Sequence, residues 1–221
     1  MKKTLPILFI IVSLTLTLTG CSIKKENSLH GKEQVEALRE EAKGWQSGRY
    51  LFTNLETGEM YQAFSFMYGT DGVQTCLYEQ VTDGNYYAEY NDGNRLYVTD
   101  GESAAVYNTG SGGYESYNKE NPHPYSTGDF LFYENLFVQS SAESSDSQGN
   151  VTYLYNYDTD KINKTLGTTL KSFVTTYTFD QSGNFLYFTQ TNSNGETEYS
   201  YRIDLVDINS LTEIENPAIA D

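Results

Sequence analysis

The residue types that most often act as nucleophiles and bases are scarce in this chain. It holds two histidines, His30 and His123, and two cysteines, Cys21 and Cys76. Nucleophilic catalysis needs a nucleophile, a base that is usually His, and a group that orients the base. His30 lies in a polar stretch and His123 lies between two prolines, so we expect structural or solvated roles for both. We also expect Cys76 to be a small buried hydrophobe, and we predict no enzymatic activity.

Metal-binding patterns are also missing. Zinc sites need several Cys or His side chains at short spacing, and the chain does not offer them. Asp158-Thr-Asp160 and Asn91-Asp-Gly-Asn94 carry oxygen ligands, but neither matches a calcium loop with alternating acidic residues and a final Glu. Turn formation is the favoured interpretation of both segments. The sequence therefore predicts no metal and no cofactor.

Length and net charge exclude further classes of function. The chain has 221 residues, which favours one compact domain, and its 14 Lys and Arg against 30 Asp and Glu give a net charge of -16. Such a charge repels a phosphate backbone, so we predict no nucleic-acid partner. Gly110-Ser-Gly-Gly113 lacks the Lys and the following helix of a phosphate-binding loop. Paired carboxylates for glycoside hydrolysis stay open, because their separation in space decides that question.

The start of the chain has the parts of a bacterial export signal. Lys2 and Lys3 precede a mostly apolar segment from Leu5 to Leu18, which is followed by Thr-Gly-Cys21. The segment is shorter than the roughly 20 apolar residues that a membrane-spanning helix needs. Leu-Thr-Gly-Cys resembles the lipobox of bacterial lipoproteins. The resemblance implies a signal peptide over residues 1–20, lipid attachment at Cys21, and an extracytoplasmic protein that this lipid anchors to the cell membrane.

A tether and one helix are expected next. Residues 21–30 are polar and predict a lipidated tether in front of one domain over 31–221. Val35, Leu38, Ala42 and Trp45 recur at spacings of three and four residues, which places them on one stripe of an amphipathic helix. Such a stripe predicts that the helix packs on a core.

Short aromatic and β-branched runs dominate the chain after Trp45. Gly, Asn and Asp separate these runs, and Asp-Gly pairs supply the positive φ of tight hairpin turns. The pattern predicts antiparallel strands. The expected strands are Arg49 to Glu56, Met60 to Tyr68, Val73 to Val81, Tyr86 to Tyr90, Arg95 to Thr99, Ala104 to Asn108, Val151 to Tyr157, Phe173 to Asp180, Phe185 to Thr191 and Glu198 to Ile208.

The middle of the chain interrupts the strands. Ser126 or Thr127 suits the N-cap of a helix that runs through Leu131 to Val138, although the aromatic residues there also suit a strand. Residues 140–150 are rich in Ser, acidic and Gly residues and predict an exposed loop. A short helix or turn is expected within residues 160–171.

Several predicted strands are apolar on both faces. In Met60 to Tyr68, for example, Phe64 and Phe66 alternate with Ala63 and Met67. Either the sheet curls and buries its concave side, or part of that side is a groove for an apolar ligand. Alternation alone gives the candidate groove residues, each of which also suits a simple core: Phe64, Phe66, Tyr68, Tyr153, Tyr155, Tyr177 and Tyr187.

The order of elements resembles the LolA-like superfamily of bacterial lipoproteins. Lipobox, tether, amphipathic helix and aromatic strands are followed by long final strands that end near Asn209, and the chain closes with Asn216-Pro217 in place of the more usual Ile-Pro. The resemblance covers most of residues 30–217. It implies a mainly β fold, a single strongly curved antiparallel half-barrel whose concave face is covered by an N-terminal helix and one or two short helices. It also implies a hydrophobic cavity between sheet and helices.

These observations lead to one functional hypothesis and two alternatives. We predict a membrane-anchored lipoprotein that binds a hydrophobic or lipid-like ligand between the curved sheet and its helices. One alternative is an envelope interaction lipoprotein with a packed core and an acidic docking face for a protein partner. The other is a carbohydrate-binding surface module, since flat Tyr rings stack on sugars.

Overall fold

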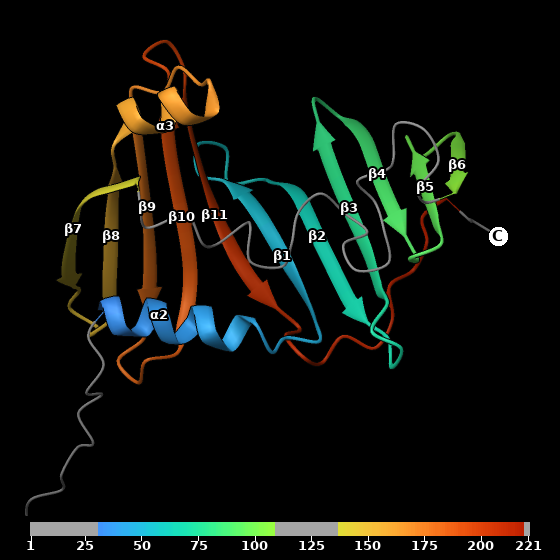
Figure 1. Cartoon of the computed structure of the whole chain (residues 1–221), viewed down its shortest axis with the longest axis horizontal. Coiled ribbons are helices and arrows are strands. Elements are labelled where there is room, and N and C mark those ends of the chain that lie inside the picture. Colours follow the sequence, from blue (N-terminus) through green and yellow to red (C-terminus); the bar gives the residue numbers. More distant parts are fainter. Residues whose placement is uncertain (1–30, 109–136, 219–221) are drawn as a thin grey trace, which may run out of the picture.

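The computed structural model describes residues 31–108 and 137–218. These ranges form one antiparallel sheet and two helices (Figure 1). The helices are α2 (Gly31–Ala42) and α3 (Thr159–Leu166). The strands are β1 (Ser47–Asn54), β2 (Met60–Tyr68), β3 (Gln74–Thr82), β4 (Asn85–Asn91), β5 (Arg95–Thr99), β6 (Ala104–Asn108), β7 (Val138–Ser145), β8 (Val151–Tyr157), β9 (Ser172–Phe179), β10 (Phe185–Ser193) and β11 (Glu198–Val206).

The sheet consists of two meanders that meet in its middle. The strand order is β6-β5-β4-β3-β2-β1-β11-β10-β9-β8-β7, so every pair except β1 and β11 joins consecutive strands. Tyr50 of β1 lies opposite Phe64 of β2 on one side and Leu205 of β11 on the other. Within the described residues the sheet is open, with β6 and β7 at its edges. The single curved antiparallel sheet predicted from the sequence is confirmed.

Asx turns hold the hairpins together. At the β9–β10 turn, Asp180 Oδ1 accepts hydrogen bonds from the Ser182 and Asn184 amides, and Asn184 Nδ2 donates to Asp180 Oδ2 at 2.8 Å. The same bonds recur at the β7–β8 turn between Asp146 and Asn150. In each turn a glycine with positive φ precedes the asparagine. Side-chain oxygens that accept backbone N–H groups are the usual reason for Asp in turns. The turn predicted at residues 91–94 is confirmed, because Asp92 Oδ1 accepts from the Asn94 and Arg95 amides, whereas Asp158 is the N-cap of α3.

The core lies on the face of the sheet that the helices cover. The chain places alternate aromatic residues of β1, β2 and β8 to β11 on this face, where α2 and α3 pack on them (Figure 1). The main core cluster contains Val35, Leu38, Ala42, Trp45, Tyr50, Phe52, Phe64, Phe66, Cys76, Tyr153, Tyr155, Tyr157, Ile162, Phe173, Tyr177, Phe179, Phe188 and Ile203. We call this face concave and the opposite face convex.

Helix α2 runs across one end of β8 to β11. Its buried stripe includes Val35, Leu38 and Ala42, as the spacing of apolar residues predicted. The first backbone amide of the helix, Gly31 N, donates to Glu143 Oε2 at 3.0 Å, which ties the helix to edge strand β7. A carboxylate at this position also suits the positive end of the helix dipole. The helix is therefore fixed both by its apolar stripe and by its first amide.

The segment after β11 covers part of the convex face. Asp207 and Asn209 adopt positive φ, and Asn209 exchanges hydrogen bonds with the start of β1 through Gln46 N and Ser47 O. The segment then runs along the end of the sheet toward β3 and β4 (Figure 1). Ile214 packs there with Leu77 and Ala88, which form a second, smaller core cluster. The two ends of the described chain thus cover opposite faces.

Two sequence predictions need correction. Residues 140–150 were expected to be a loop, but β7 continues to Ser145 and only the turn that follows is irregular. Seven of its side chains are exposed, because an edge strand with a polar sequence can be held mainly by its backbone pairing, here to β8. The predicted helix from Ser126 or Thr127 lies outside the described residues up to 136, and its expected last residue, Val138, begins β7. A short helix or turn is predicted within residues 160–171, and α3 shows that a short helix forms there.

Both core clusters and all the strands and helices that the structure describes lie within residues 31–108 and 137–218. A chain that starts at Ser22 therefore keeps all of them. Neither of the two helices found in the described ranges has the length and apolar character of a membrane span.

Candidate ligand pockets

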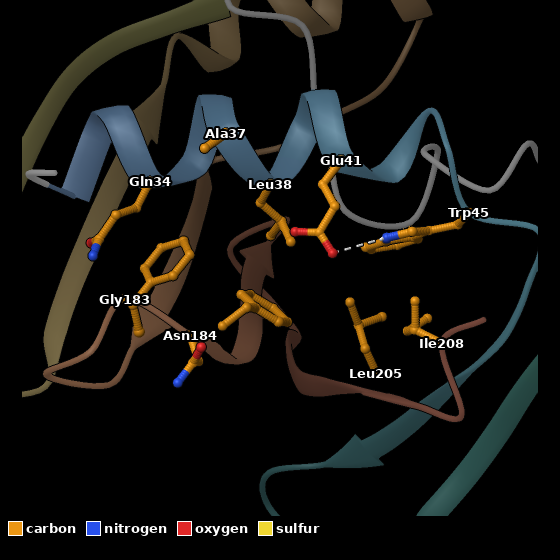
Figure 2. Close-up of a pocket in the computed structure, with 11 residues that line it drawn as sticks. Gln34, Ala37, Leu38, Glu41, Trp45, Gly183, Asn184, Leu205 and Ile208 are labelled. Carbon is orange, nitrogen blue, oxygen red and sulfur yellow. Dashed lines mark hydrogen bonds between the residues drawn. The ribbon is translucent and has the colours of Figure 1, made fainter. Parts of the chain in front are cut away.

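The first pocket lies between α2 and the sheet (Figure 2). Its volume is about 330 Å³, near the lower end of the range typical of small-molecule sites. The helix contributes Gln34, Ala37, Leu38 and Glu41, and Trp45 follows it. The sheet contributes Phe179, Gly183, Asn184, Phe185, Leu205 and Ile208. We call this site the helix pocket.

The helix side of this pocket carries a buried carbonyl oxygen without a hydrogen-bond partner. Gln34 is 3% exposed, and its Oε1 is buried with no hydrogen-bond partner. A buried polar group without a partner destabilises a fold by roughly 1–3 kcal/mol. Glu41, by contrast, accepts a hydrogen bond from Trp45 Nε1 at 3.4 Å (Figure 2). The carbonyl oxygen of Gln34 is therefore the polar atom of this wall that has no partner in the fold.

The sheet side of the pocket is mostly apolar. Phe179 and Phe185 pack edge to face with ring centroids 5.7 Å apart, and Leu205 and Ile208 lie below the end of the helix (Figure 2). The register of β9 and β10 shifts between Phe185 and Tyr187, which marks a bulge. A bulge of this kind lets Phe185 turn toward the pocket beside Phe179. The arrangement suits a ligand with an apolar body and a polar group near Gln34.

A second pocket lies at the opposite end of β11. Its volume is about 620 Å³, and it is lined by residues of the β1–β2, β3–β4 and β10–β11 hairpins. Its aromatic wall contains Tyr61, Tyr199 and Tyr201. We call this site the hairpin pocket. It shares no lining residue with the helix pocket.

The residues predicted to form a groove lie in two different places. Phe64, Phe66, Tyr153, Tyr155 and Tyr177 are buried in the main core cluster. Tyr68 packs against that cluster and is partly buried. Tyr187 faces the other way, with the Arg202 guanidinium 4.2 Å above its ring. None of the seven lines the helix pocket or the hairpin pocket, so ligand contact by them stays a prediction.

Buried hydroxyl and thiol groups on the concave face are held in their neutral forms. Burial, together with Tyr153 and Glu36, raises the pKa of the Tyr155 hydroxyl, which also has no hydrogen-bond partner. Burial and the nearby Glu89 likewise raise the pKa of the Cys76 thiol. A thiol with a raised pKa is a poor nucleophile at neutral pH. Residues 31–108 and 137–218 hold no group of His, Cys, Asp and Glu that is suited to bind a metal ion.

Sequence reasoning missed the lining of the helix pocket. Phe179 and Phe185 were placed on strands, and Leu38 on a buried helical stripe, but nothing in their spacing shows that space remains between them. Gln34 carried a usable signal. A polar residue beside Val35, at a position that faces the sheet, departs from the apolar stripe of an amphipathic helix.

The comparisons with known proteins concern the fold. No protein-family model matches the chain, and no curated protein matches its sequence. The crystal structure of LprF from Mycobacterium bovis matches with a TM-score of 0.51 and 12% sequence identity, over 85% of this chain and 97% of that one. This similarity supports the LolA-like fold predicted from the sequence. At this identity it is a likeness of fold alone.

Proposed function

We propose that the protein is a non-enzymatic lipoprotein that binds a hydrophobic or lipid-like ligand in the helix pocket. The buried and unpartnered carbonyl oxygen of Gln34, in a pocket whose sheet side is mostly apolar, supports this proposal most directly. A filled structural core gains nothing from such a group, whereas a bound ligand with a hydroxyl or amide N–H group could donate a hydrogen bond to it. The LolA-like fold is consistent with this use of the space between helix and sheet.

The chain offers its own reporter for this test. Trp45 is the single tryptophan of the chain and lines the helix pocket, so its emission reports on that site. The protein from Ser22 onward is titrated with monodecanoylglycerol, which has a short acyl chain and a neutral hydroxyl head group. We expect a saturable change in Trp45 emission. Mass spectrometry of lipid extracted from the purified protein is expected to show bound lipid.

A blocking variant and a matched control locate the binding. Ala37 is exposed but lines the pocket, so Ala37→Phe adds a ring to the pocket without removing a core side chain. Glu40→Phe places the same ring on an exposed position of α2 outside the pocket. We expect Ala37→Phe to abolish both signals and Glu40→Phe to keep them. A protein that stays empty and gives no Trp45 response would contradict the proposal and favour the docking alternative.

Gln34→Leu separates ligand binding from stability. Replacing the unpartnered amide with an apolar side chain should raise the free energy of unfolding of the empty protein by roughly 1 kcal/mol. The same change should weaken binding of monodecanoylglycerol, because its hydroxyl head group loses its partner. Equal binding by Gln34→Leu and the unchanged protein would mean that Gln34 has no part in recognition.

Membrane anchoring through Cys21 completes the proposal. The lipobox resemblance supports acylation of its thiol, which would hold the domain at the outer side of the membrane. In cells that make the full chain, Cys21→Ser is expected to move the protein from the membrane fraction to the soluble fraction. Retention of Cys21→Ser in the membrane fraction would contradict lipid anchoring at this residue.

A further inference from the structure

The hairpin pocket combines aromatic rings with carboxylates. Tyr61 comes from β2, Tyr199 and Tyr201 come from β11, and Met60 and Val81 add apolar surface. Tyr61 and Tyr201 meet edge to face at 6.5 Å, and Tyr201 packs on Phe52 of the main core cluster at 5.8 Å. The floor of the pocket therefore rests on the core.

A strand irregularity creates this aromatic wall. Phe52 pairs with Gln62 and Thr53 pairs with Met60, so Tyr61 is an extra residue in β2. An extra residue bends the strand and redirects its side chain. Tyr61 consequently joins Phe52 and Tyr201 on the concave face, where simple alternation from Gln62 would have placed it on the convex one.

The rim of the pocket exposes unusually large apolar side chains. Met60 is 58% exposed, Val81 is 47% exposed and Tyr199 is 60% exposed. These three residues lie on different strands, yet all line the same pocket. Exposed apolar groups that gather around a hollow are typical of binding sites. Three such residues around one pocket can contact the same ligand, which a single exposed residue could not do alone.

The charges around the pocket are all negative. Glu56, Glu59, Asp83 and Glu198 line it, and no Lys or Arg does. Within the described residues none of these four carboxylates forms an ion pair, whereas Glu40 and Asp158 pair with nearby lysines. Uncompensated carboxylates of one sign attract a cation to the space between them. Aromatic faces attract cations as well.

The walls that carry these groups are held in place before any ligand arrives. Asn54 Oδ1 accepts hydrogen bonds from the amides of Glu56 and Thr57, and Asn194 Oδ1 accepts from those of Glu196 and Thr197. Leu55 N donates to Ser200 O at 3.0 Å, which joins the two hairpins. A pocket whose loops are already ordered binds with a smaller entropy loss.

We propose that the hairpin pocket binds an organic cation with an apolar body, such as an alkylammonium group. The aromatic wall and the exposed apolar rim match the body, and the four carboxylates match the charge. This inference is independent of the helix pocket, because the two sites lie at opposite ends of β11 and share no residue.

Isothermal titration calorimetry with a charge series tests the inference. The protein from Ser22 onward is titrated with hexyltrimethylammonium, with 1-hexanol as the neutral probe and with heptanoate as the anionic probe. We expect the cation to bind roughly tenfold more tightly than the alcohol, and heptanoate not to bind. Binding of the cation should weaken with added salt. Equal affinity for the cation and the alcohol would overturn the proposal.

Variants at exposed positions locate the cation. Tyr199→Ala should weaken its binding roughly fivefold, and Glu59→Gln with Glu198→Gln roughly tenfold. Tyr107→Ala and Glu40→Gln, which change a tyrosine and a glutamate elsewhere on the surface, should leave the affinity unchanged. An unchanged affinity in Tyr199→Ala would contradict the proposed site. Thermal melts confirm that each variant is folded.

One further variant keeps the two proposals apart. Ala37→Phe blocks the helix pocket and should leave binding of hexyltrimethylammonium intact, and the cation should not alter Trp45 emission. Loss of cation binding in Ala37→Phe would place the cation beneath α2 and overturn the inference. Failure of monodecanoylglycerol to bind the helix pocket would leave the calorimetric result for the cation unaffected.

Discussion

The two faces of the sheet are buried in different ways. On the concave face, α2 and α3 cover a continuous set of aromatic residues that extends from β3 to β8 through β1 and β11. On the convex face, a segment without regular secondary structure covers a smaller cluster around Leu77 and Ala88, through Ile214. On β8 to β11, the convex face carries pairs of hydroxyl groups instead. The Oγ1 atoms of Thr176 and Thr189, for example, are 2.6 Å apart.

The two faces therefore contribute differently to the stability of the fold. Apolar area removed from water is the main source of folding free energy, so most of it comes from the concave face. The convex cluster buries little area and serves mainly to hold the C-terminal segment against β3 and β4. Each candidate pocket has aromatic side chains that pack on the larger core, Phe185 in the helix pocket and Tyr201 in the hairpin pocket, and this packing fixes the positions of those walls. The following predictions test this contrast, from the largest effect to the smallest.

Truncation in the concave core should have the largest effect. Phe64 is fully buried between Tyr50 and Phe66, so Phe64→Ala leaves a cavity that few neighbours can fill. We expect a loss of about 3–5 kcal/mol in the free energy of unfolding, measured by urea denaturation. Met60→Ala, on the same strand but exposed, serves as control. A loss below 1 kcal/mol for Phe64→Ala, by the same scale, would mean that the cluster is not close-packed.

A larger side chain at Gly48, where β1 meets the segment after β11, should have the second-largest effect on stability. A Cβ on Gly48 would lie 2.4 Å from Ile208 Cδ1 and 3.2 Å from Phe66. Gly48→Ala should therefore destabilise the protein by about 1–3 kcal/mol. Gly44→Ala is the matched control, because its Cβ meets only Glu41 O at 3.5 Å. Similar melting temperatures for the two variants would show that the region around Gly48 adapts freely.

Truncation on the convex face should cost less. Ile214→Ala removes the side chain that covers Leu77 and Ala88, but the segment that carries it can settle onto the sheet. We expect a loss of about 1 kcal/mol, below the roughly 2–5 kcal/mol usual for truncation of a buried Ile to Ala, because this site collapses easily. Hydrogen exchange should quicken in β3 and β4 and stay unchanged in β8 to β10. A loss as large as that of Phe64→Ala would remove the contrast between the faces.

Protonation of the turn aspartates at low pH should change the free energy of unfolding by the smallest amount of these four. Hydrogen bonds from the Asn150 and Asn184 side chains and from backbone amides lower the pKa of Asp146 and Asp180 below the ordinary value of 3.8. A carboxyl whose folded pKa is lowered stabilises the fold above its unfolded pKa and loses that contribution as pH falls through the folded value. The unfolding free energy should therefore decline below pH 3.8. In Asp146→Asn with Asp180→Asn, we expect a shallower decline in urea titrations at each pH.

The sequence predicted the sheet well because its signals are local. Alternating aromatic residues and Asp-Gly turns placed most strands within a few residues of their observed ends. Strand β7 was not predicted, because its polar composition is typical of a loop. The turn motif that follows the strand was not used. Asp146-Ser-Gln-Gly-Asn150 repeats the pattern of Asp180-Gln-Ser-Gly-Asn184, which joins two strands that were predicted. The repeated motif was sufficient to place a hairpin at β7 and β8.

The pockets were harder to predict because they depend on long-range placement. The residues of the helix pocket come from α2 and from strands more than 130 positions later in the chain. The hairpin pocket depends on an extra residue at Tyr61 that changes which face the ring occupies. Alternation along a strand identifies which aromatic rings share a face of the sheet, and in this way it predicted the aromatic residues of the core. It carries no information on where helices leave that face uncovered.

The pairing of β1 with β11 sets an order of events during synthesis. A ribosome makes β1 first and β11 last of all the strands, yet the two are neighbours in the middle of the sheet. Until β11 is complete, β1 to β6 and β7 to β10 can pair only as two separate pieces, each with an open edge. A nascent chain that ends before residue 198 therefore cannot join the two halves of the sheet, so they stay separate until the last described strand has been made.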